Sequence, residues 1–291
     1  MNKQGYPNFL NLYPSMAFGG AQSDLEASEF VLIGAPLDST GTFRTGYREG
    51  PNAIRTVSAQ IEQYSYRFSV DASKANVHDL GDLSLGPEPA ENVNVVEQAV
   101  SRIRSMSKIP IILGGEHTIA FGGFLGSEAD RLIVFDAHMD LRDEYLGSKF
   151  SHATWLRRLL DRVDLGRVLQ VGTRSTSEDE LASNPPRIEM VASDALMARR
   201  FESVKKWIRP GLKYYLSIDL DVFDPPYAPG VGNPEPEGIS PTVFFDLLKE
   251  LSPLDMVGFD VCELIPRYDP SGITTILASK IALELLCAKI A

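Results

Sequence analysis

Three short apolar runs each end in a cluster of acidic residues and histidines, and this pattern limits the possible folds more than any other feature. The runs cover residues 111–113, 132–135 and 214–218 of the 291-residue chain. Continuous apolar runs of this length are typical of parallel strands that are buried on both faces. Because ligands of open α/β sheets bind beyond the carboxyl ends of the strands, we expect the three clusters at one edge of a single sheet.

The spacing within the clusters predicts a shared direction for their polar side chains. Side chains alternate between two faces along an extended chain, so residues at i, i+2 and i+4 can point the same way. The second and third clusters both follow this spacing, and the first adds a histidine. The six candidate ligands are His117, Asp136, His138, Asp140, Asp219 and Asp221.

Four carboxylates and two imidazoles suit Mn²⁺ or a similar divalent ion better than a thiolate-bound structural zinc. One ion could not take six protein ligands and keep an open position, whereas two ions about 3.5–4 Å apart could share bridging carboxylates. An alternative interpretation is that each cluster starts a loop and supplies helix caps and surface charge. Without a bound cation, however, four neighbouring carboxylates would raise each other's pKa values.

Strand and helix signals alternate along the chain, which predicts an α/β fold with a parallel sheet of about eight strands covered by helices on both faces. We expect strands at residues 30–33, 77–83, 109–113, 131–135, 167–171, 188–191, 213–218 and 256–261. We expect helices at residues 51–64, 90–107, 152–161, 202–208, 241–251 and 274–290, the fifth capped by Ser240. No linker interrupts this alternation, so residues 30–291 are predicted to form one catalytic domain behind an N-terminal extension, residues 1–29.

The formal net charge of −11 at pH 7 argues against a nucleic-acid partner, because such proteins usually carry a basic patch. An acidic cleft would attract a cationic small molecule, although the charge could equally serve solubility. The first 20 residues lack the apolar core of a signal peptide, and no apolar stretch reaches the roughly 20 residues of a membrane helix. Cys262 and Cys287 are expected to be buried free thiols, so we predict a cytoplasmic protein without a membrane partner.

Two further residues are candidates for substrate binding and proton transfer. Glu263 follows an apolar strand and could accept two parallel hydrogen bonds from a guanidinium group, or it could be an ordinary strand-end charge. His152 could carry protons near neutral pH, or it could be a helix cap or core histidine. His78 lies outside every cluster and is interpreted as structural. A proline- and glycine-rich loop at residues 224–230 is expected to wall the site.

The motifs resemble those of the ureohydrolase family, which includes arginase and agmatinase. The matching stretches are Gly114-Gly115-Glu116-His117-Thr118, Asp136-Ala137-His138-Met139-Asp140, Ser217-Ile218-Asp219-Leu220-Asp221-Val222-Phe223-Asp224-Pro225 and Ala228-Pro229-Gly230. Glu263 and residues 34–55 are similar too, so the resemblance runs from Gly34 to the final helix. It implies a doubly wound parallel sheet and a homo-oligomer, either a trimer or a hexamer.

The resemblance also implies a dinuclear manganese centre that hydrolyses a guanidino group to urea and an amine. One Mn²⁺ would be held by His117 and Asp140 and the other by His138 and Asp221. Asp136 and Asp219 would bridge the two ions. Hydroxide supplied by the metal centre would attack the guanidinium carbon. Asp140 would help to protonate the departing amine, Glu263 would hold the guanidinium group, and His152 would relay protons.

Within this family the sequence is most similar to agmatinase. Glu116 stands where arginases usually have aspartate, and Arg142 stands where arginases have an asparagine that reads the amino-acid end of the substrate. Agmatine is therefore the expected substrate. The alternatives are aminopropylagmatine, guanidinobutyrate, arginine, formiminoglutamate, or a catalytically silent metal-binding role.

Ala153, Asn233 and Glu237 depart from residues common in the family. Glu237 is a candidate for attracting a second amino group of a longer polyamine. Arg142 and two further loop arginines, Arg44 and Arg48, are interpreted as solvated or salt-bridged surface residues.

Overall fold

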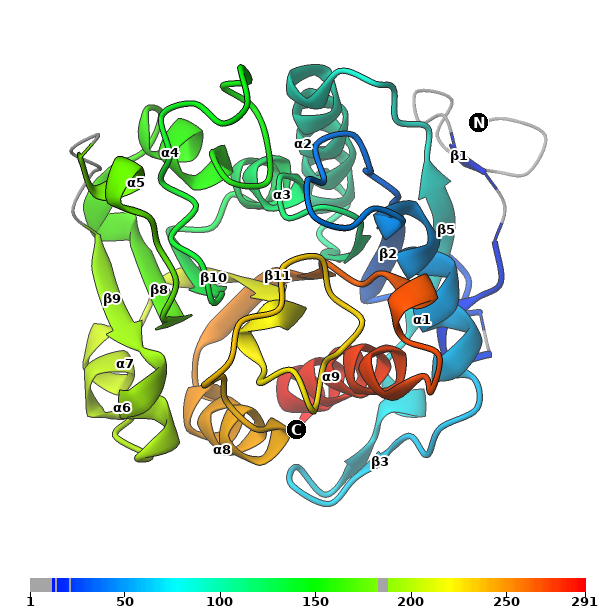
Figure 1. Ribbon diagram of the computed structural model, residues 1–291. Coiled ribbons are helices and arrows are strands. Elements are labelled where there is room, and N and C mark those ends of the chain that lie inside the picture. The colour runs from blue at the N-terminus through cyan, green and yellow to red at the C-terminus, as the bar shows by residue number, and fades with distance from the viewer. Residues whose placement is uncertain (1–11, 14, 21, 183–187) are drawn as a thin grey trace.

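A mostly parallel sheet runs through the centre of the computed structural model, which describes residues 12–13, 15–20, 22–182 and 188–291 (Figure 1). Within these residues the strand order is β1-β5-β2-β6-β11-β10-β7-β8-β9. The strands are β1 (Leu12–Tyr13), β2 (Phe30–Ala35), β5 (Val77–Leu83), β6 (Ile109–Gly114), β7 (Arg131–Phe135), β8 (Val168–Thr173), β9 (Glu189–Ala192), β10 (Lys213–Asp219) and β11 (Asp255–Cys262). A separate hairpin pairs β3 (Tyr64–Ser65) with β4 (Val70–Asp71).

The parallel sheet predicted from the sequence is confirmed, with nine strands where about eight were expected. The added strand is β1, a two-residue segment that pairs antiparallel with β5, whereas the other pairs of the sheet are parallel. A strand of two residues is too short to form an apolar run, so the sequence did not predict it. β1 belongs to the predicted N-terminal extension, whose residues 1–11, 14 and 21 lie outside the described part of the chain. The division at residues 29 and 30 stays a prediction.

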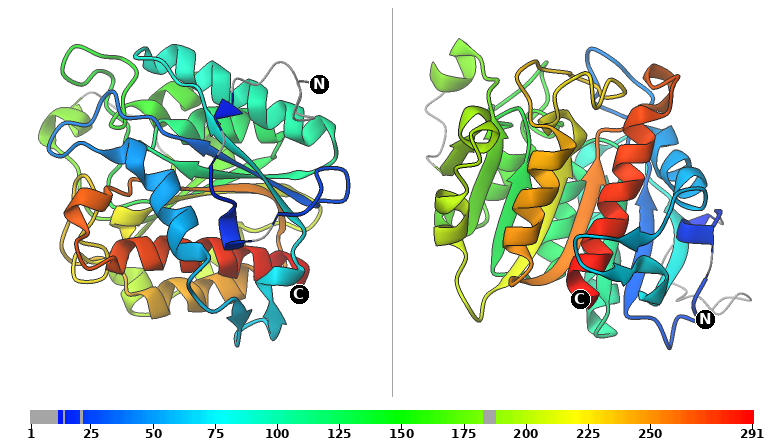
Figure 2. Two further views of the ribbon diagram at one scale, coloured as in Figure 1. Left: turned by 90° about the vertical axis from the view of Figure 1, so that its right-hand side faces the viewer. Right: turned by 90° about the horizontal axis from the view of Figure 1, so that it is seen from below.

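Helices cover both faces of the sheet, so the domain has three layers (Figure 2). The α-helices are α1 (Gly50–Ser58), α2 (Pro89–Ser105), α3 (Ile119–Ser127), α4 (Trp155–Leu160), α5 (Glu178–Ala182), α6 (Ser193–Met197), α7 (Glu202–Trp207), α8 (Pro241–Leu251) and α9 (Ile273–Ile290). Short 3-10 turns lie at Phe18–Gly20, Tyr47–Glu49, Ala72–Lys74, Leu165–Arg167, Leu220–Val222 and Pro266–Tyr268. The predicted Ser240 cap is confirmed, because its hydroxyl accepts a hydrogen bond from the backbone of Val243 at 3.3 Å.

Alternate residues of each central strand pack into different layers, as the pleat of a strand requires. In β7, Ile133 belongs to the hydrophobic core beneath α8 and α9, whereas Leu132 and Val134 belong to the core beneath α3 and α4. All three side chains are fully buried. Burial on both faces explains why these strands read as uninterrupted apolar runs in the sequence.

Two helix predictions need correction. The helix expected at residues 51–64 ends at Ser58, because the following chain forms the β3–β4 hairpin and places Ser65 against α9, where its hydroxyl donates to Glu284 at 2.7 Å. The helix expected at residues 152–161 begins only at Trp155. Its predicted first residues form a turn in which the backbone N–H of Ser151 donates to the Thr154 hydroxyl at 2.8 Å.

The order of the strands brings four carboxyl ends together. Four parallel strands are adjacent in the order β6, β11, β10 and β7. Along the chain they are spread over residues 109–262. Neighbouring strands lie about 4.8 Å apart, so residues that follow these four strands can share one small site.

Both cysteines are buried free thiols, as predicted. Across the described residues, none of the helices has the length and apolarity that a membrane crossing requires.

Candidate active site

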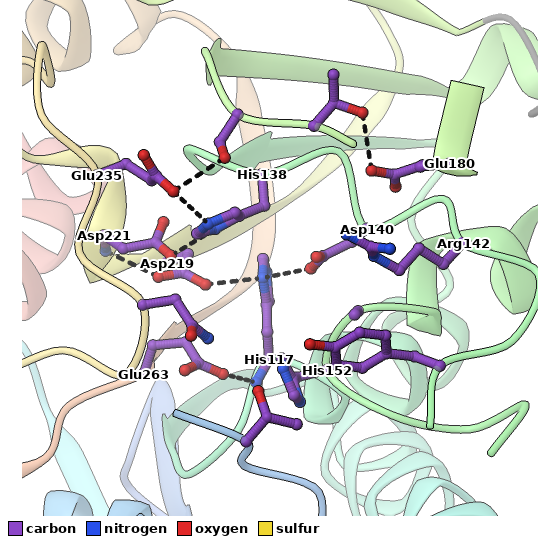
Figure 3. Close-up of a pocket in the computed structure, with 16 residues that line it drawn as sticks. His117, His138, Asp140, Arg142, His152, Glu180, Asp219, Asp221, Glu235 and Glu263 are labelled. Carbon is purple, nitrogen blue, oxygen red and sulfur yellow. Dashed lines mark hydrogen bonds and ion pairs between the residues drawn. The ribbon is translucent and has the colours of Figure 1, made fainter. Parts of the chain in front are cut away.

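The residues predicted as metal ligands converge at the carboxyl ends of β6, β7 and β10 (Figure 3). All of them except Asp136 line a cavity of about 200 Å³, together with other residues from the same edge. Five of the six ligand candidates are at least nine-tenths buried, and His138 is 25 % exposed. The structure therefore brings the three sequence clusters together in one cluster, as expected.

His117 faces three of the carboxylates. Its Nδ1 atom lies 3.0 Å from Asp136 Oδ2, 3.1 Å from Asp219 Oδ2 and 3.5 Å from Asp140 Oδ2. Its other ring nitrogen, Nε2, lies 3.0 Å from the Ser217 hydroxyl. That contact turns Nδ1 toward the carboxylates.

His138 forms the second half of the cluster. Its Nδ1 atom lies 2.8 Å from Asp221 Oδ2 and 3.7 Å from Asp136 Oδ1. The two oxygens of Asp136 thus face different imidazoles, so this carboxylate lies between the two halves. Such a position is the one that a bridging ligand of a dinuclear centre needs.

The donor set fits divalent metal ions. His117 Nδ1 and Asp136 Oδ2 are buried but form no hydrogen bond in the described structure, although polar atoms in a protein interior are normally paired. Carboxylate oxygens combined with imidazole nitrogens suit Mn²⁺ and related ions. The two triads that converge here are His117–Asp136–Asp140 and Asp136–His138–Asp221.

Cys262 also lies within ligand distance of His117 and Asp219. Burial, however, raises the pKa of its thiol well above the ordinary range, and only the thiolate is a good metal ligand. Its Sγ–H points toward the backbone carbonyl of Ile218, 3.6 Å away. We therefore leave Cys262 out of the candidate ligand set.

The carboxylates strongly influence each other's protonation when no cation balances them. Burial raises the pKa of Asp140 to about 7, and the Asp136 carboxylate contributes to the increase. Burial also raises the pKa of Asp219, with further contributions from Asp221 and Asp136. Burial would raise the pKa of Asp136 as well, but the neighbouring imidazoles of His117 and His138 outweigh it and lower the pKa. Two dications would remove the repulsion among these groups.

Glu263 lies beside the cluster, at the end of β11. One of its oxygens accepts a hydrogen bond from the backbone N–H of His117 at 2.7 Å, and the side chain lines the cavity. Glu263 has a backbone φ of 68°, in the left-handed region, and Asp140 has a φ of 54°. Both carboxylates point into the site from backbone conformations that non-glycine residues seldom adopt.

His152 lines the same cavity and is not a helix cap, because Thr154 holds the N-cap position of α4 (Figure 3). Its Nδ1 atom lies 3.2 Å from the Thr40 hydroxyl, and its ring packs edge-on against Tyr145 with the ring centroids 5.9 Å apart. Burial lowers the pKa of His152 to about 4. His78, by contrast, lies in β5 with its Nδ1 atom 2.7 Å from the carbonyl of Ser23, away from the cavity, as predicted.

The cavity contains charged residues that the sequence motifs did not single out. Glu235 lies 3.8 Å from Nε2 of His138 and accepts a hydrogen bond from the Ser175 hydroxyl at 3.0 Å. Glu180 is buried and accepts hydrogen bonds from the backbone of Leu141 at 2.7 Å and from the Thr176 hydroxyl at 2.9 Å. No motif flagged either residue, because Glu180 lies in the short helix α5 and Glu235 lies in a loop, and only the tertiary fold brings both to the site.

Two of the three predictions about loop arginines change. Arg142 lines the cavity, with its guanidinium group 4.9 Å from the ring centroid of Tyr145, and is therefore not merely a surface residue. Arg44 is half-buried and donates to the carbonyls of Pro229 and Val231 at 3.1 and 2.9 Å. Arg48 is the expected surface ion pair, 3.0 Å from Asp38.

The wall of the cavity is formed by residues 233 and 235, just beyond the proline- and glycine-rich loop 224–230 that was expected there. Glu237 is exposed and does not line the cavity. Its φ of 65° lies in the left-handed region that favours glycine. The structure therefore offers no support for Glu237 as an amine-binding residue. The glutamate that lines the cavity wall is Glu235.

Comparisons with known proteins agree with this geometry. Residues 28–288 match the Arginase family. The chain is 32 % identical to the guanidinobutyrase of Pseudomonas aeruginosa, over 97 % of this chain and 93 % of the relative. It is 33 % identical to an agmatinase of Halalkalibacterium halodurans, over 96 % and 98 % of the two chains.

The structural comparison gives the same result. The crystal structure of the agmatine ureohydrolase of Thermoplasma volcanium superimposes with a TM-score of 0.86 and 33 % identity, covering 96 % of this chain and 95 % of the other. The sequence match and the structural match both extend over nearly the whole length of the chain. The chain belongs to the Arginase family.

Proposed function

We propose that the protein hydrolyses a guanidino group to urea and an amine at a dinuclear Mn²⁺ centre, with agmatine as substrate and putrescine as product. The observation that carries the proposal is the position of Glu263, a carboxylate that lines the cavity beside the six candidate metal ligands. A carboxylate there could hold a planar guanidinium group by two parallel hydrogen bonds, with the guanidinium carbon close to the cluster. The family membership and the similarity to named agmatinases support the same reaction.

His117 and Asp140 would hold one ion, and His138 and Asp221 the other. Asp136 and Asp219 would be shared. When bound, the two ions would lower the pKa of a water molecule, so that hydroxide is available near neutral pH. The distances from His117 and His138 to their neighbouring carboxylates support these assignments.

The remaining residues would orient the substrate and move protons. The indole of Trp155 donates to Asp140 Oδ2 at 2.7 Å, which fixes that carboxylate against the cavity. Asp140 would pass a proton toward the nitrogen of the departing amine. His152, which also lines the cavity, would relay protons between the site and the solvent.

The outer part of the cavity favours a cationic tail. Glu180 and Glu235 line it in addition to the metal cluster and Glu263, so a second positive charge would be stabilised there. This distribution supports agmatine and, because the cavity is open to solvent at Glu235, a longer polyamine conjugate. We further propose a role in polyamine synthesis, a cytoplasmic location and assembly into a trimer or hexamer.

A guanidino acid is the second candidate substrate, because Arg142 also lines the cavity. Its guanidinium group could pair with the carboxylate of guanidinobutyrate. The 32 % identity to a guanidinobutyrase is consistent with this alternative. The two candidates differ in the sign of the charge at the tail, so turnover can distinguish them.

The proposal is tested by measuring urea release from Mn²⁺-loaded protein with agmatine, aminopropylagmatine, guanidinobutyrate, arginine and formiminoglutamate in parallel, with formamide measured for the last. We expect kcat/KM for agmatine to exceed that for guanidinobutyrate at least ~10-fold, the equivalent of one favourable charge contact. The Arg142→Gln variant should keep agmatine turnover. A preference for guanidinobutyrate that this variant abolishes would instead establish the second candidate. No product from any substrate, with two metals bound per chain, would contradict both and favour a silent homologue.

A further inference from the structure

Thr40 lies in the loop between β2 and α1, and its hydroxyl contacts three polar groups. It donates a short hydrogen bond to Oε2 of Glu116. It also accepts from the backbone N–H of His152 at 3.1 Å and lies 3.2 Å from Nδ1 of the same histidine. Thr40 therefore connects a buried carboxylate outside the proposed ligand set to the proposed proton carrier.

Glu116 is fully buried and holds the Thr40 loop through its second oxygen. Oε1 accepts hydrogen bonds from the backbone N–H groups of Ser39, Thr40 and Gly41, the last two at 2.6 and 3.2 Å. Three backbone donors on one oxygen favour the ionised form, which can only accept hydrogen bonds.

The single proton of the Thr40 hydroxyl then determines the donor and the acceptor in each of its three contacts. A threonine hydroxyl has one proton and two acceptor sites. Its proton goes to the Glu116 carboxylate, and one acceptor site is taken by the backbone N–H of His152. The remaining site can only accept, so the proton of the third contact must reside on His152 Nδ1.

A neutral imidazole with its proton on Nδ1 has an unprotonated Nε2. Burial keeps His152 neutral at pH 7, because it lowers the pKa to about 4. Tyr145 holds the ring plane by its edge-on contact. Nε2 then lies on the side of the ring away from Thr40 and is free to take up a proton.

We infer that Glu116 and Thr40 are positioning residues that select the Nδ1–H tautomer of His152, so that Nε2 is the atom that accepts and returns the proton during turnover. The tautomer follows from the hydrogen bonds of a buried, neutral ring, whereas its use in turnover rests on the proposed function. Glu116 acts at a distance from the substrate, through Thr40.

The tautomer can be read by ¹⁵N NMR, because the chain contains only four histidines. Zn²⁺-loaded protein is suitable, since this ion is diamagnetic, and the His152→Gln variant assigns the signal. We expect His152 to carry its proton on Nδ1. In Glu116→Gln the new amide N–H would donate to the Thr40 oxygen, which frees the hydroxyl proton for Nδ1. His152 should then switch to the Nε2–H tautomer.

The matching kinetic readout is a change in kcat without a change in KM. With Mn²⁺ bound, Glu116→Gln should lower kcat at least ~10-fold and leave KM and metal content within about twofold, since general acid–base transfer contributes ~10²-fold or more. Thr40→Val should also lower kcat, and Thr40→Ser, which keeps the hydroxyl, should restore both kcat and the Nδ1–H tautomer. This pair tests the link independently of how well Glu116→Gln folds.

An Nε2–H tautomer in the parent protein would overturn the inference. So would an unchanged tautomer in Glu116→Gln combined with a lower kcat, because that result would make Glu116 a loop anchor only. If no substrate yields urea, the proposed function fails, but the NMR result still decides the tautomer. The two failures are therefore distinguishable.

Discussion

Two carboxylates of the site occupy left-handed backbone conformations, which are rare for residues with a Cβ atom. Asp140 has a φ of 54° and Glu263 a φ of 68°. Conformations of this kind cost about 1–3 kcal/mol each and persist where the surrounding structure enforces them. Both residues line the cavity. This strain lowers the stability of the fold, but it directs both carboxylates into the cavity.

At Glu263, we predict that replacement by glutamine separates substrate binding from metal binding. The amide keeps the size of the side chain but removes the charge that would pair with a guanidinium group. Loss of one charge-assisted contact costs about 1.5–3 kcal/mol, so kcat/KM should fall ~10- to 100-fold. Metal content per chain, measured by elemental analysis, should not change.

The matched comparison is Asp136→Ala, which removes the carboxylate between His117 and His138. This variant should lose both ions together with activity. Parent-like metal content in Asp136→Ala would contradict the bridging assignment. Unchanged kinetics in Glu263→Gln would remove Glu263 from substrate binding.

Among the elements, the contact between α2 and α3 depends on glycines that lie along one side of α3. A Cβ atom at Gly122 would lie 2.4 Å from the carbonyl oxygen of Val93 and 2.9 Å from the backbone nitrogen of Glu97. A Cβ atom at Gly126 would lie 2.5 Å from the carbonyl oxygen of Glu97. The obstacles are backbone atoms of α2, which cannot move aside independently of the helix. The absence of side chains thus lets the two helices approach closely.

We predict that Gly122→Ala destabilises the protein although alanine is the better helix former. Overpacking typically costs about 1–3 kcal/mol, which exceeds the helix propensity gained of up to about 1 kcal/mol. The free energy of unfolding in urea should therefore fall. Gly86→Ala is the control, because a Cβ atom there would meet nothing within 4 Å and its φ is not positive. Equal stability of the two variants would contradict the close-packing explanation.

Local sequence patterns predicted some elements of the fold and missed others. β7 and α8 were predicted with the bounds that the structure shows, because their apolar patterns agree with their burial. α3 was missed, since three glycines in nine residues weaken any helix pattern, and their reason lies in another helix. For the site, local spacing predicted the six clustered ligand candidates. Glu235 and the Glu116–Thr40 contact depend on loops, and Glu180 depends on the short helix α5, and these segments meet only in the folded chain.

For the whole molecule, the cluster makes stability depend on metal and pH together. In the metal-free protein, burial raises the pKa of Asp140 to about 7, above the value of about 4 that an unfolded chain has. Between these two values the folded state binds more protons than the unfolded state. Stability of the metal-free protein from this group is therefore lost as the pH rises from about 4 to about 7. Burial raises the pKa of Asp219 in the same direction.

We predict that Mn²⁺ raises the melting temperature more at pH 8 than at pH 5.5. At the higher pH the ligands are already deprotonated, so the ion does not compete with protons. At 100 times Kd, binding adds about 2.7 kcal/mol, or roughly 5 °C for a chain of this size. Thermal scans with and without Mn²⁺ at both pH values measure the effect, and Asp136→Ala should show no shift. An equal or larger shift at pH 5.5 would contradict the ligand assignment.

The late position of β11 in the chain has a consequence for synthesis on the ribosome. β10 and β11 insert between β6 and β7, which are made much earlier. A nascent chain that stops before residue 213 therefore has two separate halves of a sheet, with the histidine of one half and the Asp136 group of the other held apart. Parallel pairing between distant segments is slow, and the open edges of β6 and β7 would be exposed to other chains meanwhile. Capture of the metal pair would thus mark the end of synthesis, and nascent chains would be most vulnerable to aggregation just before it.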